Sequence, residues 1–253
     1  MLFPTIVPPL VLFLLTVVPV QANSYIVSLF TSHKNWITEA SATVILPAVP
    51  HSVKGDASIW SGITMAGPNL TGDLLQGVSS NAPKTDTFCG RTIGGCSEYC
   101  GTRTDGWCGF AYTLLEDPDD AAIIGATMPD VKPGAEVRTH CYGQHGAIFD
   151  IAIECAMGDC APVPAHTWTS ISIVLDTADL SFKHHGPWGY NATGGEMSTE
   201  DGGKTWNIAK LHVPQQKPCI DKVTFKGRYC PDVEWPEHAT VDMNVTEVPA
   251  LSG

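Results

Sequence analysis

Hydrophobic and polar residues alternate along many short segments of this chain, and a period of two is typical of β-strands with one buried face. The strand-like segments are 24–30, 41–46, 110–116, 121–126, 136–142, 147–154, 168–175, 206–213, 222–229 and 239–245. In 147–154 the acidic residues Asp150 and Glu154 fall between isoleucines, which predicts that both carboxyls face away from the core. No segment shows a helical apolar stripe longer than two turns.

An antiparallel strand pair is predicted around Gln76. The apolar segments 59–63 and 74–78 flank a turn-rich connection, so they are expected to pair antiparallel. Gln76 follows two leucines, where an apolar residue would be less costly to bury. If this strand is covered on both faces, the amide needs hydrogen-bond partners or a ligand. The alternative is an outward-facing glutamine on a half-exposed strand.

Many short strands, together with 24 glycines and 19 prolines, favour an all-β antiparallel sandwich or barrel. The chain has no internal repeat and no linker-like stretch, so we expect one domain over residues 23–253. Residues 1–22 are almost uncharged and apolar, and they end in Val20-Gln21-Ala22, a small-x-small pattern typical of signal-peptide cleavage sites. The mature protein is therefore predicted to be secreted and extracellular, with no membrane segment.

The net negative charge of the chain limits the kinds of molecule that it can bind. The chain carries 14 Lys and Arg against 26 Asp and Glu, a net charge of −12. Such a surface repels nucleic acid and anionic membranes. Protonation of carboxylates near pH 4 would remove much of this charge, which suits an acidic exterior.

Cysteines and sequons agree with secretion. Nine cysteines lie at positions 89, 96, 100, 108, 141, 155, 160, 219 and 230, where disulfides are the default in an oxidising compartment, and the odd count leaves one thiol unpaired or intermolecular. The Gly- and Ser-rich stretch 79–108 has few large apolar residues, so it is predicted to be a disulfide-stapled loop insert. Asn69, Asn191 and Asn244 begin Asn-x-Thr glycosylation sequons.

Most catalytic motifs are absent from the sequence. There is no Gly-x-Ser-x-Gly elbow and no phosphate-binding loop. The cysteines lack the paired spacing of a zinc site, and the adjacent His184 and His185 would point to opposite faces of a strand, so neither a metal nor a cofactor is expected. Glu196 with Glu200 or Asp201 remains a candidate acid–base pair.

Six segments carry a resemblance when they are taken in order: Ser41–Pro47, Ile59–Ile63, Leu74–Val78, Ala111–Gly134, Gly195–Asp201 and Val223–Phe225. Over roughly residues 35–245 this order and spacing resemble those of the secreted glutamic peptidases of fungi, the eqolisin family. The resemblance implies a two-sheet β-sandwich of the concanavalin A-like jelly-roll type, whose concave face binds an extended or unfolded polypeptide.

The resemblance also implies site residues. The glutamine–glutamate dyad of that family maps onto Gln76 and Glu196, and its cleft tryptophan maps onto Trp60. A carboxylate can activate water and return a proton to the leaving amine, while a neighbouring amide stabilises the oxyanion. The expected function is that of a monomeric, acid-acting endopeptidase without a cofactor.

Two other functions remain open. Thr64 and Ser79 stand where the family has acidic cleft residues, so a divergent, catalytically inactive glycan- or protein-binding relative is one alternative. The other is a polysaccharide-cleaving enzyme on the same fold, using Glu196 with a second carboxylate.

Overall fold

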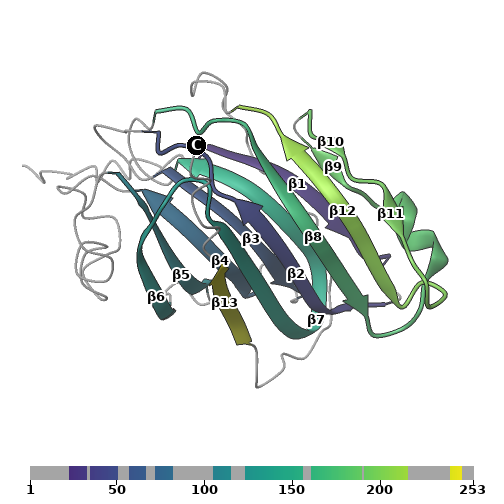
Figure 1. Cartoon of the computed structure of the whole chain (residues 1–253). Helices are drawn as coiled ribbons and strands as arrows, with labels where there is room; N and C mark the ends of the chain where they lie inside the picture. Colours follow the sequence, from purple (N-terminus) through teal and green to yellow (C-terminus); the bar gives the residue numbers. More distant parts are fainter. Residues whose placement is uncertain are drawn as a thin grey trace, which may run out of the picture.

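The computed structural model of the chain is all-β (Figure 1). It describes residues 23–32, 35–50, 57–66, 72–81, 105–114, 123–155, 161–189, 191–215 and 240–246. Within these ranges one short 3₁₀ helix, η1 (Leu180–His184), accompanies the strands. The thirteen strands are β1 Asn23–Phe30, β2 Ile37–Ile45, β3 Ala57–Met65, β4 Leu74–Asn81, β5 Trp107–Leu114, β6 Ile123–Val131, β7 Glu136–Cys155, β8 His166–Leu175, β9 Trp188–Gly189, β10 Thr193–Gly194, β11 Met197–Ser198, β12 Thr205–Val213 and β13 Thr240–Thr246.

The long strand β7 connects the two layers of the fold. Its first half pairs with β2 and β13, and its second half pairs with β3 and β1, all antiparallel. Layer A therefore consists of β9, β1, the second half of β7, β3, β4, β5 and β6. Layer B consists of β13, the first half of β7, β2, β8, β12, β10 and β11. One continuous hydrogen-bonded sheet thus folds into a two-layer β-sandwich (Figure 1).

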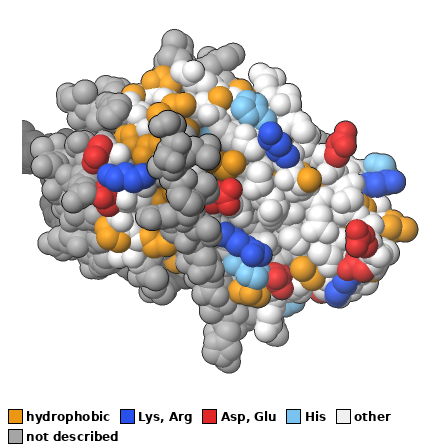
Figure 2. Space-filling view, in the orientation of Figure 1, with side chains coloured by type: hydrophobic (Ala, Val, Ile, Leu, Met, Phe, Trp, Pro, Cys, Tyr) orange, Lys and Arg blue, Asp and Glu red, His pale blue; other side chains and the backbone are white. Residues whose placement is uncertain are grey.

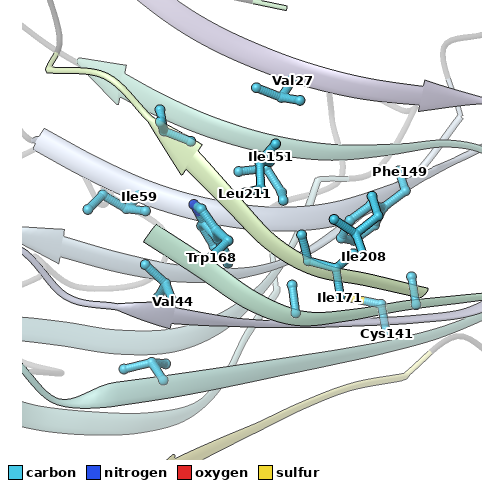
Figure 3. Packing of buried hydrophobic residues seen from close by; sticks show 14 of the residues in the cluster. Val27, Val44, Ile59, Cys141, Phe149, Ile151, Trp168, Ile171, Ile208 and Leu211 are labelled. Atoms are coloured by element: carbon cyan, nitrogen blue, oxygen red, sulfur yellow. The ribbon is translucent and has the colours of Figure 1, made fainter. Parts of the chain in front are cut away.

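The main core lies between these layers (Figure 3). Layer A contributes Phe149 and Ile151 from β7, and layer B contributes Trp168 from β8 and Ile208 from β12. All four side chains are almost fully buried. A strand presents alternate residues to opposite faces, so each strand has a second row of side chains on an outer face.

The strands agree with most of the sequence predictions. The segments around 59–63 and 74–78 form the antiparallel pair β3–β4. The two strands predicted at 136–142 and 147–154 are one strand, because the intervening residues 143–146 also have extended backbone. Gly146 meets Ile37 and Ile63 so closely that a Cβ there would lie 2.5 Å from the Ile63 side chain, so glycine permits this passage between layers.

Several other predictions lie wholly or partly outside the described residues. These are the signal peptide, the strand at 222–229, Asn69 and most of the cysteine-rich insert. The ends of that insert belong to strands, since β4 continues to Asn81 and β5 begins at Trp107. Cys108 is disulfide-bonded, and Cys141 is buried with its Sγ 3.6 Å from the carbonyl oxygen of Leu75. The wider pairing pattern stays a prediction.

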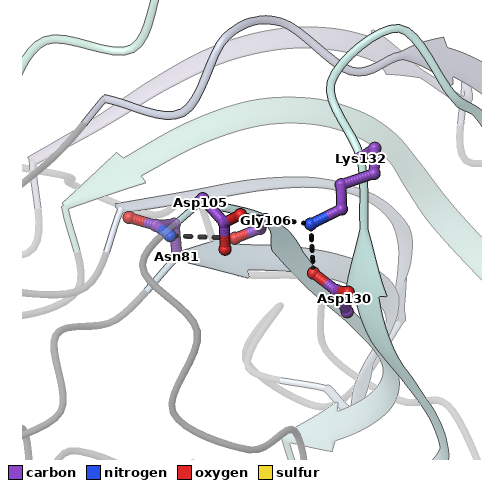
Figure 4. A network of polar contacts seen from close by, with 5 residues as sticks. All are labelled: Asn81, Asp105, Gly106, Asp130 and Lys132. Carbon is purple, nitrogen blue, oxygen red and sulfur yellow. Dashed lines mark hydrogen bonds and ion pairs between the residues drawn. The ribbon is translucent and has the colours of Figure 1, made fainter.

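A polar network joins the ends of β4, β5 and β6 (Figure 4). The Asn81 amide donates to the Gly106 carbonyl oxygen at 2.9 Å. Lys132 Nζ lies 2.6 Å from Asp130 and 3.3 Å from Asp105. The hydrogen bond to Asp130 raises the pKa of the lysine. These contacts hold the turn after β6 against the start of β5.

Candidate active site

Gln76 lies on the outer face of layer A. Its neighbour Leu75 enters the main core, so the amide points the other way. Gln76 pairs in register with Gly62 on β3 and Tyr112 on β5. Its side chain is buried, and Oε1 has no hydrogen-bond partner among the described residues. The half-exposed alternative is therefore wrong, and a buried acceptor that lacks a partner within the described ranges calls for an explanation such as a ligand.

Asp150 lies across Gly62 from Gln76. Gly62 pairs with Gln76 on one side and with Asp150 of β7 on the other. Two strand spacings separate the Gln76 and Asp150 backbones by about 10 Å, and only a glycine stands between them. A Cβ on residue 62 would lie 2.4 Å from the Leu75 carbonyl oxygen and 2.9 Å from the Gln76 Cβ. Glycine is thus required here, because the neighbouring strand β4 approaches too closely for any side chain at this position.

The surroundings of Asp150 favour its protonated form. The side chain is buried, and desolvation raises its pKa to about 6, against the opposing effect of two hydroxyl hydrogen bonds. Ser28 Oγ on β1 donates to Asp150 Oδ1 at 2.5 Å, and Thr64 on β3 supplies the other bond. Asp150 can therefore carry a proton in mildly acidic solution, as a general acid must.

An apolar cluster adjoins the Gln76–Asp150 row on the same outer face. It consists of Trp60, Val78, Phe110 and Ala152. Trp60 Nε1 donates to Glu154 Oε2 at 3.0 Å, and desolvation raises the pKa of that carboxyl. The predicted cleft residue Trp60 therefore shares a face with Gln76. It lies two residues before Gly62 on β3, at the next position on the same face.

Glu196 lies in a different part of the sandwich. It stands between β10 and β11, which pair with β12 in layer B, and its side chain is exposed. The next residue, Met197, packs against the main core. No contact between Glu196 and Gln76 is present among the described residues. Glu200 is exposed as well.

Asp201 has a structural role. Its Oδ1 accepts hydrogen bonds from the backbone N–H groups of Thr205 and Lys204 at 2.8 and 3.1 Å, and from the Thr199 hydroxyl at 2.9 Å. These bonds, the one from the Thr205 backbone first, lower its pKa to about 2. Asp201 closes the turn before β12, and its lowered pKa makes it a poor proton donor.

Other predicted sites are placed as follows. Among the residues that the structure describes, no group of three or more His, Cys, Asp or Glu side chains is arranged to hold a metal ion, and no helix is long and apolar enough to cross a membrane. His184 is exposed at the end of η1, whereas His185 Nδ1 lies 3.2 Å from the Phe30 carbonyl oxygen. The sequon residue Asn191 is exposed, and Asn244 lies on β13.

His166 on β8 is a buried titratable group outside this site. Its Nδ1 lies 3.1 Å from the Pro164 carbonyl oxygen, and desolvation lowers its pKa to about 4. The unfolded chain takes up this proton near pH 6.5, so the folding contribution of neutral His166 is complete above that pH and is lost as the pH falls toward 4. The gap of roughly 2.5 pKa units corresponds to about 3 kcal/mol.

We therefore expect His166→Gln to weaken the acid destabilisation of the fold. Between pH 7 and pH 4, the free energy of unfolding should fall by about 3 kcal/mol less in the variant than in the wild type. Urea denaturation at both pH values measures this difference, and His184→Gln serves as the exposed control. An equal fall of the free energy of unfolding in the wild type and in His166→Gln would contradict the lowered pKa of His166.

Comparison with known proteins gives weak matches. No protein family and no curated protein matches the sequence. Two solved structures of scytalido-glutamic peptidase, one with a peptide-based transition state analog and one with a transition state analog inhibitor, are 12% and 11% identical, each with a TM-score of 0.41. SCP-B, a member of the eqolisin family in complex with the tripeptide Ala-Ile-His, is 12% identical with a TM-score of 0.40. Each comparison covers 75% of this chain and 98% of the other. A likeness at this level carries no argument about the reaction, which has to rest on the residues themselves.

Proposed function

We propose that this protein is a secreted, acid-acting endopeptidase that cleaves extended or unfolded polypeptides at the outer face of layer A. The observation that carries the proposal is the row Gln76–Gly62–Asp150. On either side of a glycine it presents a buried carboxyl with a pKa of about 6 and a buried amide whose Oε1 has no partner in the described part of the chain. A carboxyl group that exchanges a proton and an amide that hydrogen-bonds to the tetrahedral intermediate can together catalyse peptide hydrolysis in acid.

Asp150 acts as the proton donor in the proposed reaction. Its carboxyl gives a proton to the scissile carbonyl oxygen while water adds to the carbonyl carbon, and the resulting carboxylate takes the proton that the added water loses. Asp150 then protonates the amide nitrogen as the C–N bond breaks. Cleavage leaves a protonated carboxylic acid, which gives its extra proton to Asp150 and departs as the neutral acid, so the enzyme ends in its starting state.

Gln76 positions the other reacting groups. Its Oε1 accepts a hydrogen bond from the attacking water, and its NH2 group donates to the oxygen of the tetrahedral intermediate. A donor aimed at the oxygen on which charge develops in the transition state contributes about 10²–10³ in kcat. The neighbouring cluster of Trp60, Val78 and Phe110 is buried in the free protein, and once the face opens it offers apolar contacts to one substrate side chain beside the cleaved bond. An extended peptide places alternate side chains on one face, which suits binding across the face of a sheet.

Glu196 remains the competing acid. The resemblance to glutamic peptidases assigns it this role, whereas its exposed place on the edge of layer B separates it from the Gln76 row. We give the role to Asp150 because it shares a register row with Gln76 and has a pKa suited to acid solution. The two assignments predict different inactive variants.

Gln76→Ala tests the proposal. We expect cleavage of denatured casein at about pH 4 to slow by about 10²–10³ in kcat, with a smaller effect on KM, because the lost contacts act mainly on the transition state. Gln144→Ala is the matched control, since Gln144 is exposed on β7. Gln76 and Asp150 are nearly buried in the free protein, so the outer face has to open before a substrate can bind. Because this opening can be slow, the digest is followed as a time course.

The outcome separates the candidate functions. Cleavage by the wild type and the control, with a strong loss in Gln76→Ala, supports the peptidase. No cleavage by the wild type at any acid pH contradicts it and returns the protein to the class of secreted binding proteins. Equal cleavage by all three proteins would move the reaction away from Gln76.

A further inference from the structure

A second cluster of reactive side chains lies on the outer face of layer B. Along the first half of β7, Val137 and Cys141 enter the main core, so Arg138, His140 and Tyr142 lie on the opposite face. Glu39 and Ser41 of β2 pair in register with Tyr142 and His140. None of these residues belongs to the Gln76 site, which lies on the outer face of the other layer.

Glu39, His140 and Tyr142 form a hydrogen-bonded relay. His140 Nε2 lies 2.6 Å from Glu39 Oε1, and Tyr142 Oη lies 2.9 Å from His140 Nδ1. The rings of His140 and Tyr142 are in contact, with centroids 4.2 Å apart. The side chain of His140 is 19% exposed and that of Glu39 is 40% exposed. A base oriented by a carboxylate and bonded to a hydroxyl is the arrangement that activates a hydroxyl group for proton transfer.

The side chain of Arg138 extends toward the register row of His140 and Ser41. Its register partner on β2 is Thr43, yet its Nη2 lies 3.4 Å from Ser41 Oγ, one row further along. Ser41 pairs with His140, so the guanidinium and the Tyr142 hydroxyl converge on the His140 row from opposite directions. A fixed cation therefore lies beside a proton-transfer group.

The rows around this point carry hydroxyl and amide side chains. His140 and Ser41 continue into Ser172 on β8 and Asn207 on β12. The Arg138 row continues through Thr43 and Thr169 to Lys210. Figure 2, which views the molecule from the side of β8 and β12, shows acidic, basic and histidine side chains interspersed on this face. The hydroxyl and amide side chains can hydrogen-bond to a hydroxylated chain, and the guanidinium of Arg138 can pair with one carboxylate of it.

We propose that this face is a second active site, which binds a uronate-containing polysaccharide and cleaves it by β-elimination with Tyr142 as the acid–base residue. Arg138 pairs with the uronate carboxylate, because a guanidinium matches a carboxylate in charge and geometry. Glu39 and His140 position and polarise the Tyr142 hydroxyl. The proposal is independent of the peptidase site and uses no metal, water or cofactor.

The atoms balance without a further reactant. His140 takes the Tyr142 proton, and Glu39 stabilises the imidazolium that forms. The Tyr142 oxygen then removes the proton from the sugar carbon next to the carboxylate, and Arg138 stabilises the negative charge that develops there. As the carbon–carbon double bond forms, the glycosidic C–O bond at the neighbouring carbon breaks, and Tyr142 gives its new proton to the leaving oxygen. His140 returns the first proton to Tyr142.

The test uses the full chain with sodium alginate and with polygalacturonate, and with a neutral glucan as the polymer control. A double bond conjugated to the carboxylate absorbs in the ultraviolet, and hydrolysis does not produce it. We expect this absorbance to rise with at least one uronate polymer and not with the glucan. Tyr142→Phe should slow the rise by about 10²–10⁴, the usual contribution of a general acid–base group.

Further variants separate catalysis from structure. Arg138→Met should raise KM more than it lowers kcat, and Glu39→Gln should displace the pH profile of the rate. Lys183→Met removes an exposed charge on η1 and should leave the rate unchanged. No absorbance with either uronate polymer overturns the proposal. So does full activity in both Tyr142→Phe and Arg138→Met.

Discussion

Asp150→Asn is expected to slow peptide cleavage by about 10²–10⁴ and to stabilise the fold at neutral pH. An amide cannot donate the catalytic proton. It also avoids the destabilisation that a buried carboxylate brings. The pKa of Asp150 is raised from 3.8 to about 6, so the stability of the wild type falls as the pH rises between these values. The difference of about 2.2 units corresponds to about 3 kcal/mol in favour of the variant at pH 7, and to almost none below pH 4.

Casein digestion and urea denaturation at pH 7 and pH 4 measure the two effects separately. Glu200→Gln, which removes an exposed carboxyl, is the control for both. Glu196→Gln decides between the two candidate acids in the same digest. An inactive Glu196→Gln beside an active Asp150→Asn would assign the acid role to Glu196 and leave the peptidase itself intact.

Phe149→Ala is expected to lower the free energy of unfolding by about 3–5 kcal/mol, the usual loss for a large aromatic side chain in a core. Phe149 is 1% exposed on the half of β7 that belongs to layer A, and it packs in the cluster shared by both layers (Figure 3). Phe30 is the matched control because it lies on the adjacent strand β1 but is 37% exposed. Phe30→Ala should cost far less.

Thermal or urea unfolding of both variants measures this difference. Similar losses in Phe149→Ala and Phe30→Ala would mean that Phe149 is not enclosed between two layers. A cooperative transition that shifts as a whole in Phe149→Ala would agree with one shared core.

Most strands were predictable from the sequence because apolar and polar residues alternate with a period of two along them. Alternation along 147–154 placed Asp150 and Glu154 on the face away from the core, and the structure agrees. Two apolar segments on either side of a turn-rich connection identified the β3–β4 pair and the strand that carries Gln76. It could not show that two predicted strands are one strand, β7, because extended backbone at Gly143 and Gly146 depends on neighbours far along the chain.

The composition of both sites was not predictable from the sequence because it depends on register. Gln76 and Asp150 are neighbours of the same glycine although 74 positions separate them along the chain. His140 meets Glu39 for the same reason. A local reading of Glu196, by contrast, joined it to the nearby Glu200 and Asp201, of which the second stabilises a turn. The polar residue in an apolar strand, Gln76, was the one local signal that marked the site.

A double-variant cycle of Gln76→Ala and Asp150→Asn tests most directly whether these two side chains act together on one substrate. The quantity measured is kcat/KM for denatured casein at about pH 4 in the wild type, the two single variants and the double variant. Groups that act as a unit lose most of their effect when either is removed, so the double variant should be about as slow as the slower single variant. Losses that multiply would show two independent contributions and contradict the pairing across Gly62, as would unchanged activity in either single variant.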